Sequence, residues 1–363
     1  MNVGQEGGVS EGPRADYSNA KSRFLYEFPD EEGVETSSRF RFLSTEYLHA
    51  YEWVFFVIEE VMKAKGIPSI SNPQGPGAKL LARILTRLRL VRNFRRSPRG
   101  PVFVPFMGYS EYKTVPFAYW SEIVPYCFDC WEPQWPRWES FFRRHRTRLA
   151  FFTALQSADY FKRALPSMTS VWLPEALAHS ECKSDRPLEN REIDVLEFGR
   201  RYENFHHAIT RGLESAGRMH KYGRIPGEQI FKSSAELTAA LGNSKMVVCF
   251  PSSITHPGRS GNVETLTQRY LESIASKCVV VGKCPSELVK LFGYNPVIEI
   301  VAGTELNQVN AILSQIAKYQ ALVERNYTRL LETGTWESRF QTILEYMNLL
   351  APDIKELAKT YAP

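Results

Sequence analysis

The stretch GNVETLTQRYLESIASKCVVVG, residues 261–282, joins an amphipathic helical pattern to a short Val-rich run. Its apolar side chains recur at helical spacing and predict one buried face over residues 263–276, made of Val263, Leu266, Tyr270, Leu271 and Ile274. The run CVVV at 278–281 that follows predicts a strand. A helix leading directly into a buried strand is typical of α/β proteins.

The same alternation extends to both sides of this stretch. We expect helices at 203–216, 233–243 and 285–292, and strands at IDVLEF (193–198), MVVCF (246–250) and VIEIV (297–301). Strands that alternate with helices over short connections predict a parallel sheet with helices on both faces.

The first half of the chain follows a similar but less regular pattern. Expected strands are RFLYEF (23–28), VFVPF (102–106), IVPYCF (123–128), LAFFTA (149–154) and SVWL (170–173), with helices at 45–65, 78–96, 135–147 and 155–165. We therefore predict an unstructured start at 1–20, an α/β domain at 21–180, a polar linker at 181–192, a second α/β domain at 193–340, and a C-terminal helix at 341–363 that packs back on the first domain.

Composition limits the class of protein. A chain of 363 residues with 43% hydrophobic content can form two cores, and a net charge of +5 is too small for a dedicated nucleic-acid binder. Six scattered cysteines and no run of membrane-spanning length predict a cytoplasmic protein. Cys127 and Cys130 form a CxxC without a second pair, so we predict packing thiols and no metal site.

Ligands of open α/β sheets bind beyond the carboxyl ends of the strands, so the residues after each strand are the candidates for function. Gly199, Arg200 and Arg201 follow the strand at 193–198 and combine close backbone approach with phosphate-binding guanidinium groups. The strand at 246–250 is followed by a Ser-, Gly- and Pro-rich segment with four further donor-binding candidates: Ser252, Ser253, Gly261 and Asn262.

The polar face of the helix expected at 263–276 carries two acids eight residues apart. Glu264, Gln268 and Glu272 would form one row from the helix start to its middle, because residues four apart lie above one another. A helix start also presents free N–H groups to a phosphate. This pattern predicts a ligand with both phosphates and hydroxyls.

These residues resemble the Glu-x7-Glu signature of retaining glycosyltransferases of the GT-B fold, in which two Rossmann-like domains face a cleft. Residues 193–345 resemble the "glycosyl transferases group 1" domain, including its spore-coat glycosyltransferase-like branch. The matching segments are FGR after the first strand, FPSS at 250–253, RYLE at 269–272 and WESR at 336–339.

The resemblance implies a role for each matching residue. Glu272 would bind the nucleotide ribose, Glu264 would contact a hydroxyl of the donor sugar, and Arg200 with Arg201 or Arg269 would hold the diphosphate. Thr265, beside Glu264, joins the donor-binding candidates. Guanidinium groups stabilise the charge that grows on a diphosphate leaving group, so we expect no cofactor and no metal ion.

The sequence departs from the family pattern at two places. Phe205 and His206 stand where typical members have a Lys, and Thr265-Leu266-Thr267 replaces a Gly-aromatic-Gly turn. We interpret His206 and its neighbour His207 as helix-surface residues.

The first domain contributes acidic candidates after its strand at 123–128. Asp129, with Glu132 as the alternative, would orient the acceptor hydroxyl or serve as general base if the enzyme inverts configuration. Trp131 and Trp135 suit stacking on a sugar face, and packing in a Trp-rich core is the competing interpretation.

A basic segment, KLLARILTRLRLVRNFRRSPR at 79–99, carries eight basic residues and no acid. We expect Leu80, Ile84, Leu88 and Val91 to pack inward, with the arginines on the outer side. Such a helix can lie on the inner face of a membrane as a peripheral contact, or it can be a solvated basic face.

The sequence thus predicts an enzyme that moves a sugar from a nucleotide-sugar donor to an acceptor, which is a glycan, a lipid-linked glycan or a small molecule. Two alternatives remain open: a sugar-nucleotide epimerase or phosphorylase on the same fold, and a non-catalytic nucleotide-sugar binding protein. The sequence does not select the base, the sugar or the acceptor.

Overall fold

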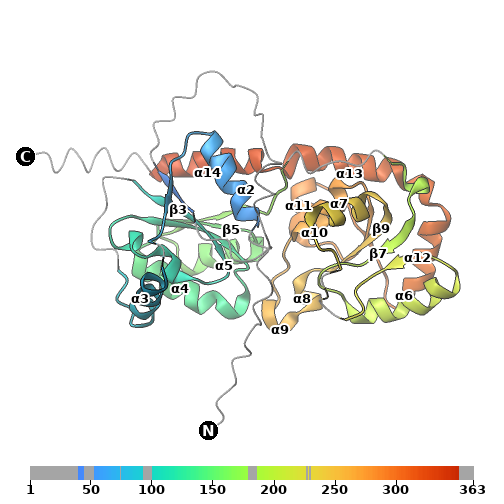
Figure 1. Cartoon of the computed structure of the whole chain (residues 1–363), viewed down its shortest axis with the longest axis horizontal. Coiled ribbons are helices and arrows are strands. Elements are labelled where there is room, and N and C mark those ends of the chain that lie inside the picture. The colour runs from blue at the N-terminus through green and yellow to red at the C-terminus, as the bar shows by residue number, and fades with distance from the viewer. Residues whose placement is uncertain are drawn as a thin grey trace, which may run out of the picture.

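Two parallel β-sheets, each covered by helices, lie side by side in the computed structural model of the chain (Figure 1). The structure describes residues 40–44, 53–73, 75–92, 100–178, 186–225, 228 and 230–350. The expected strand at 23–28, the tail at 1–20 and the thiol Cys182 lie outside these residues.

The first sheet has the strand order β2-β1-β3-β4-β5-β6, and every pairing is parallel. Its strands are β1 (Arg41–Ser44), β2 (Ser69–Ser71), β3 (Val102–Met107), β4 (Ile123–Phe128), β5 (Leu149–Phe152) and β6 (Thr169–Trp172). Strands β3, β4 and β5 are almost wholly buried, as expected of strands with a helical layer on each face.

Helices cover both faces of this sheet. One face packs on α2 (Trp53–Ala64), and the other on α4 (Trp135–His145) and α5 (Leu155–Ala164). Short elements fill the remaining connections: α3 (Pro76–Arg87) and the 3-10 turns η2 (Glu111–Thr114), η3 (Phe117–Tyr119) and η4 (Glu132–Gln134).

The second sheet has the order β11-β10-β9-β7-β8 and is also parallel throughout. Its strands are β7 (Ile193–Leu196), β8 (His220–Lys221), β9 (Ser244–Cys249), β10 (Val279–Gly282) and β11 (Ile298–Glu299).

Apolar side chains of four helices pack on one face of the second sheet, namely α7 (Ser234–Gly242), α10 (Gln268–Ala275), α11 (Ser286–Phe292) and α13 (Gln320–Thr333). The opposite face packs on α6 (Glu203–Ser215) and α12 (Glu305–Ser314). Shorter elements complete this half: η6 (Leu188–Asn190), η7 (Ile316–Tyr319), α8 (Ser252–Thr255) and α9 (Pro257–Ser260).

The last described helix, α14 (Trp336–Leu350), returns to the first sheet, where it lies beside α2 (Figure 1). Trp336, Phe340, Ile343 and Met347 enter the same core as the side chains of α2. The chain therefore crosses between the halves twice. The two crossings pair through an isolated parallel bridge between Leu177 and Thr335.

Most expected elements form where the sequence places them. The structure confirms, within two residues at each end, the strands at 123–128, 149–154 and 246–250 and the helices at 155–165 and 203–216. Strands β1, β2 and β8 were missed. They span four, three and two residues, too few for periodicity to distinguish them from loops.

The helix expected at 263–276 is wrong at its start, because α10 begins at Gln268. Val263 and Leu266 are buried as predicted, but they belong to a segment without regular secondary structure ahead of the helix. Glu264 therefore does not share a helical row with Gln268 and Glu272.

The orientation expected for the basic segment is also wrong. Leu80, Ile84 and Leu88 are 60%, 45% and 61% exposed, and of the four side chains expected to point inward only Val91 is buried. Helix α3 ends at Arg87, and residues 93–99 lie outside the described part of the chain.

No helix among the described residues is both long enough and apolar enough to cross a bilayer.

We predict that Trp336→Ala lowers the free energy of unfolding by about 3–5 kcal/mol, because it empties a large volume from the core that α14 shares with the first sheet. Trp336 is 3% exposed and its ring meets that of Tyr126 edge to face. Leu349→Ala is the control on the same helix, since Leu349 is 72% exposed and should change stability by less than about 0.5 kcal/mol. Equal urea midpoints for the two variants would contradict this packing.

Candidate active site

The carboxyl ends of the two sheets face each other. The segments that follow β4, β5 and β6 contact the second domain through Asp129, Leu155 and Ala176 respectively. Since ligands of open parallel sheets bind beyond the carboxyl ends of the strands, the space between these two edges is the candidate site.

Within the second sheet the strand order reverses at β7. The chain passes from β7 to β8 on one side and then returns to β9 on the other. The loop after β7, with Gly199 and Arg200, therefore lies beside the loop after β9, with Pro251 and Ser252. A crevice at such a switch point is the usual ligand position in this architecture.

Arg269, on α10, holds these two loops together. Its guanidinium donates to the carbonyl oxygens of Phe198 (3.3 Å) and Arg200 (2.6 Å) on one side, and of Phe250 (3.2 Å) on the other. A Cβ atom on Gly199 would lie 3.2 Å from the Arg269 Cδ, and Gly199 has a φ of 69°, so glycine suits this position on both counts. Arg269 thus positions the switch point through backbone groups.

The side chain of Arg200, unlike that of Arg269, makes no hydrogen bond to these loops. It is half-buried, and its guanidinium makes no hydrogen bond or ion pair with any residue that the structure describes. Burial lowers the pKa of Arg200, and the like charge of Arg269 lowers it further. Nearby Arg259 adds a third positive charge, and burial together with these arginines lowers the pKa of His256. This wall of the site therefore concentrates positive charge.

Acids of the first domain form the opposite wall. Asp129 accepts a hydrogen bond from Arg259 (Oδ2 to Nη2, 3.0 Å) across the two domains. Burial raises the pKa of Asp129, while Arg259 and Arg200 oppose the shift. Burial, with the nearby charges of Asp129 and Glu287, raises the pKa of Glu175 to about 8, so this carboxyl is largely protonated at neutral pH.

Glu175 was not among the sequence candidates, although it follows β6 at the carboxyl edge of the sheet. Hydrogen bonds hold the backbone on both sides of it: the Tyr126 hydroxyl donates to Leu173 O (2.9 Å), Arg339 Nε to Pro174 O (2.9 Å), and Gln268 Nε2 to Ala176 O (3.0 Å). The strand-end rule that selected Asp129 would have found Glu175 if applied to every strand.

The loop between α9 and α10 joins the two domains. Gly261 has a φ of 61°, and a Cβ atom there would lie 2.4 Å from Glu132 Oε2, so only glycine allows this approach. Asn262 N donates to the same oxygen (2.8 Å), and Gln156 Nε2 donates to Asn262 O (3.0 Å). Gly261 and Asn262 thus have interface contacts through their backbone.

Glu264 lies at this interface too. Its backbone N–H donates to Gln156 Oε1 (2.6 Å), and its carboxylate accepts from Ser286 N, the first residue of α11, at 3.2 Å. One carboxylate oxygen therefore caps a neighbouring helix.

Glu287 was missed because it sits inside an ordinary amphipathic pattern. It is 1% exposed, and its carboxyl accepts from Leu155 N of the first domain (2.9 Å) and from Leu266 N of the second. Burial raises its pKa to about 7 although these N–H groups oppose the shift. Glu287 therefore connects the domains behind the site.

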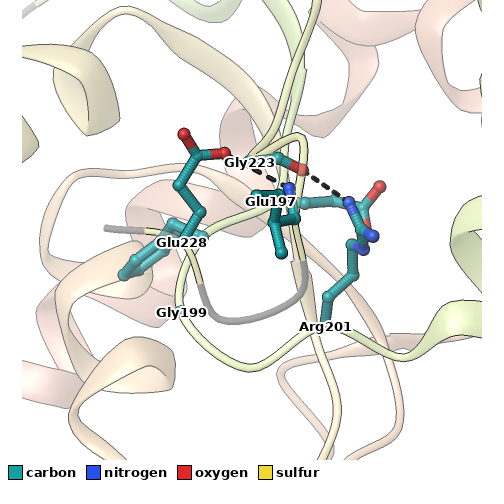
Figure 2. A pocket seen from close by; sticks show the side chains of 7 residues that line it. Glu197, Gly199, Arg201, Gly223 and Glu228 are labelled. Carbon is teal, nitrogen blue, oxygen red and sulfur yellow. Dashed lines mark hydrogen bonds between the residues drawn. The ribbon is translucent and has the colours of Figure 1, made fainter. Parts of the chain in front are cut away.

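Arg201, which was predicted to bind phosphate, makes its hydrogen bonds and its ion pair within its own domain. Its guanidinium donates to Gly223 O (2.6 Å) and pairs with Glu203 (2.8 Å). Figure 2 shows it on the wall of a recess at the carboxyl end of β7, which Glu197, Gly199 and Gly223 also line.

The remaining candidates divide by burial. Ser252 and Thr265 are buried, and their hydroxyl oxygens have no hydrogen-bond partner among the described residues. The same is true of the hydroxyl of Thr267. Buried polar atoms without protein partners commonly bind water or ligand. Ser253 on α8 and Glu272 on α10 are half-buried.

The two tryptophans serve packing. Trp131 is 1% exposed, and Trp135 stacks on Tyr160 with ring centroids 4.1 Å apart. The interpretation as sugar-stacking residues is therefore wrong for Trp131, and the Trp135 ring is already stacked.

Comparison with solved structures identifies the architecture. HepE from Anabaena, crystallised with UDP and glucose, has a TM-score of 0.55 at 10% sequence identity, and the match covers 85% of this chain and 99% of HepE. The fold is GT-B. A glycosyltransferase from Rickettsia africae has a TM-score of 0.52 at 10% identity, covering 86% and 99%. No protein-family model and no curated protein matches the sequence. The predicted fold, two Rossmann-like domains, is confirmed.

The raised pKa of Glu175 makes stability depend on pH. Between the usual value near 4.5 and about 8, the folded state holds a proton that the unfolded state has released. The contribution of this group is therefore complete at low pH and is lost as pH rises through about 8.

We predict that Glu175→Gln gains stability relative to the wild type as the pH rises from 5 to 8, because a neutral amide has no proton to lose. Urea unfolding at each pH measures the difference, and Glu345→Gln at an exposed position provides the control. A constant difference between Glu175→Gln and the wild type over this range would show that Glu175 titrates normally.

Proposed function

We propose that the protein transfers a glycosyl group from a nucleotide-activated donor to an acceptor hydroxyl. The observation that carries the proposal is the half-buried Arg200 guanidinium, uncommitted among the described residues, at the switch point of a GT-B fold. The structural neighbour HepE, in a structure with a TM-score of 0.54, was crystallised with UDP, which supports a nucleoside diphosphate as the anion.

The arginines give this site its chemistry. Arg200, Arg259 and Arg269 hold like charges close together, and this repulsion is only partly offset by Asp129, which pairs with Arg259. A bound diphosphate relieves this repulsion, and the relief grows as negative charge develops on the leaving group in the transition state. Guanidinium groups then supply the positive charge, so the proposed transfer needs neither a cofactor nor a metal ion at the diphosphate.

The acids complete the arrangement in the proposal. Glu272 would bind the ribose, as the Glu-x7-Glu resemblance implies. One carboxylate oxygen of Glu264 would accept a hydrogen bond from the donor sugar, while the other caps α11. Asp129 would orient the acceptor hydroxyl, and Glu175, protonated at neutral pH, would donate a hydrogen bond. Retention of configuration rests on the resemblance, and proton NMR of the product's anomeric centre tests it.

One panel of variants tests the donor site. Arg200→Ala should lower donor turnover by on the order of a hundredfold, about 2.7 kcal/mol, because it removes charge stabilisation in the transition state. Glu272→Ala should weaken binding of the nucleoside diphosphate, whereas Glu264→Gln should bind it normally and lose turnover. Release of nucleoside diphosphate from labelled donors and calorimetry provide the two measurements.

Arg211→Ala is the matched control, because Arg211 is exposed on α6 in the same domain. Wild-type turnover in Arg200→Ala would remove the observation on which the proposal rests. Nucleotide binding without turnover of any donor would favour a non-catalytic binding protein.

We also propose that the acceptor is presented at an anionic membrane surface. Helix α3 and the residues after it expose Leu80, Leu81, Ile84, Leu88 and Leu90, each at least 45% accessible. The same segment, residues 79–92, carries five basic side chains and no acid. Apolar side chains flanked by lysine and arginine fit the boundary between headgroups and acyl chains.

The triple variant Leu80→Gln, Ile84→Gln, Leu88→Gln should bind phosphatidylglycerol vesicles at least about tenfold less tightly than the wild type, a loss of about 1.4 kcal/mol. Val301→Gln, an exposed apolar position in the other domain, is the control. Co-sedimentation with vesicles measures both. Equal binding by all three proteins would exclude α3 as the membrane contact.

A further inference from the structure

Three side chains with metal-binding groups converge at the carboxyl end of β7. Glu197 Oε1 lies 2.8 Å from His206 Nδ1 and 2.8 Å from His220 Nε2, and the three ligand atoms all lie within 4.8 Å of one another. They come from separate elements: Glu197 follows β7, His206 is on α6 and His220 is on β8.

This cluster is buried and held in place by its surroundings. Glu197 and His206 are 4% and 5% exposed, and the His220 side chain is 1% exposed. The ring of Tyr222 packs against both imidazoles, with centroids 4.6 Å apart in each case. His206 was interpreted as a helix-surface residue, which is wrong, whereas its neighbour His207 is 74% exposed.

We propose that Glu197, His206 and His220 bind a divalent transition-metal ion, with zinc as the ion that best matches the ligands. Two imidazole nitrogens and one carboxylate oxygen form a ligand set common for zinc, which leaves one coordination position for water. Metal bonds of about 2.0–2.1 Å place tetrahedral ligands about 3.3 Å apart. The two 2.8 Å contacts would open by about half an ångström, and the two imidazole nitrogens, which lie within 4.8 Å of each other, would adjust to the same spacing.

One member of the cluster borders a recess, and the positive charge of the nearby arginine is already paired. Glu197 lines the recess at the end of β7, together with Gly199 and Gly223 (Figure 2). Arg201 on the same wall opposes a cation, but its charge is paired with Glu203 at 2.8 Å.

The site lies outside the proposed transfer step, and the ion would act on the chain around it. An ion shared by β7, α6 and β8 fixes both ends of the loop that carries Gly199 and Arg200. The ion would therefore stabilise the loop geometry on which Arg200 depends, without contacting the reacting atoms. This proposal concerns this chain's own cluster and stands independently of the proposed function.

Metal titration of the tag-free, chelator-treated protein tests the site. We expect one equivalent of Co2+ to bind and to give the visible absorption of a four-coordinate ion, and Zn2+ to displace it and to raise the Tm. His206→Gln and His220→Gln should each lose the Co2+ spectrum, whereas the control His207→Gln should keep it. X-ray absorption of the zinc-loaded wild type reads the ligand set directly, even if a variant fails to fold.

Two imidazoles with oxygen ligands in that spectrum are the expected result. Failure of the wild type to bind one equivalent, a spectrum retained in both histidine variants, or cysteine sulfur among the ligands would overturn the site. The cluster would then be a hydrogen-bonded network only.

Discussion

The guanidinium of Arg269 is the contact on which the arrangement of the site depends. It donates to carbonyl oxygens of two loops that are far apart in sequence, Phe198 and Arg200 after β7 and Phe250 after β9. Carbonyl groups at the ends of parallel strands leave the sheet ladder and need new partners, and a planar guanidinium with several N–H groups can serve both loops at once. Arg269 thus fixes the backbone of Arg200, whose own guanidinium makes no hydrogen bond or ion pair with any residue that the structure describes.

The two walls of the site have opposite electrostatic properties. Positive charge crowds the second domain around Arg200, while the first domain contributes Asp129 and the largely protonated Glu175. Burial lowers the pKa of Arg200 and raises the pKa of Asp129 and of Glu175, since it disfavours the charged form of each group. Direct contacts of Asp129 with Arg259 and of Leu155 with Glu287 connect the two domains, so the two walls face each other in a fixed geometry.

Sequence patterns predicted the longer strands and helices, in which buried and exposed side chains recur at regular spacing. Long buried strands and amphipathic helices leave a periodic signal, and the strand-end rule predicted that Gly199, Arg200 and Asp129 lie at the carboxyl ends of β7 and β4, where the structure has them. Periodicity failed where tertiary contacts replace helical hydrogen bonds. Val263 and Leu266 are buried like helical residues, yet the backbone N–H groups of Glu264 and Leu266 donate to the side chains of Gln156 and Glu287, and the segment is not helical. Burial of the Glu197, His206 and His220 cluster arises from pairing of β7 with β8, a strand of two residues that no local pattern reveals.

Hydrogen–deuterium exchange with and without each common nucleoside diphosphate tests the central claim most directly, because it shows which backbone segments a ligand covers. We predict protection of the two loops that Arg269 connects, residues 198–201 and 250–253, with the same loops protected for whichever nucleotide binds. Protection confined to other parts of the chain, or no protection by any nucleotide, would contradict a donor site at the switch point of the second sheet.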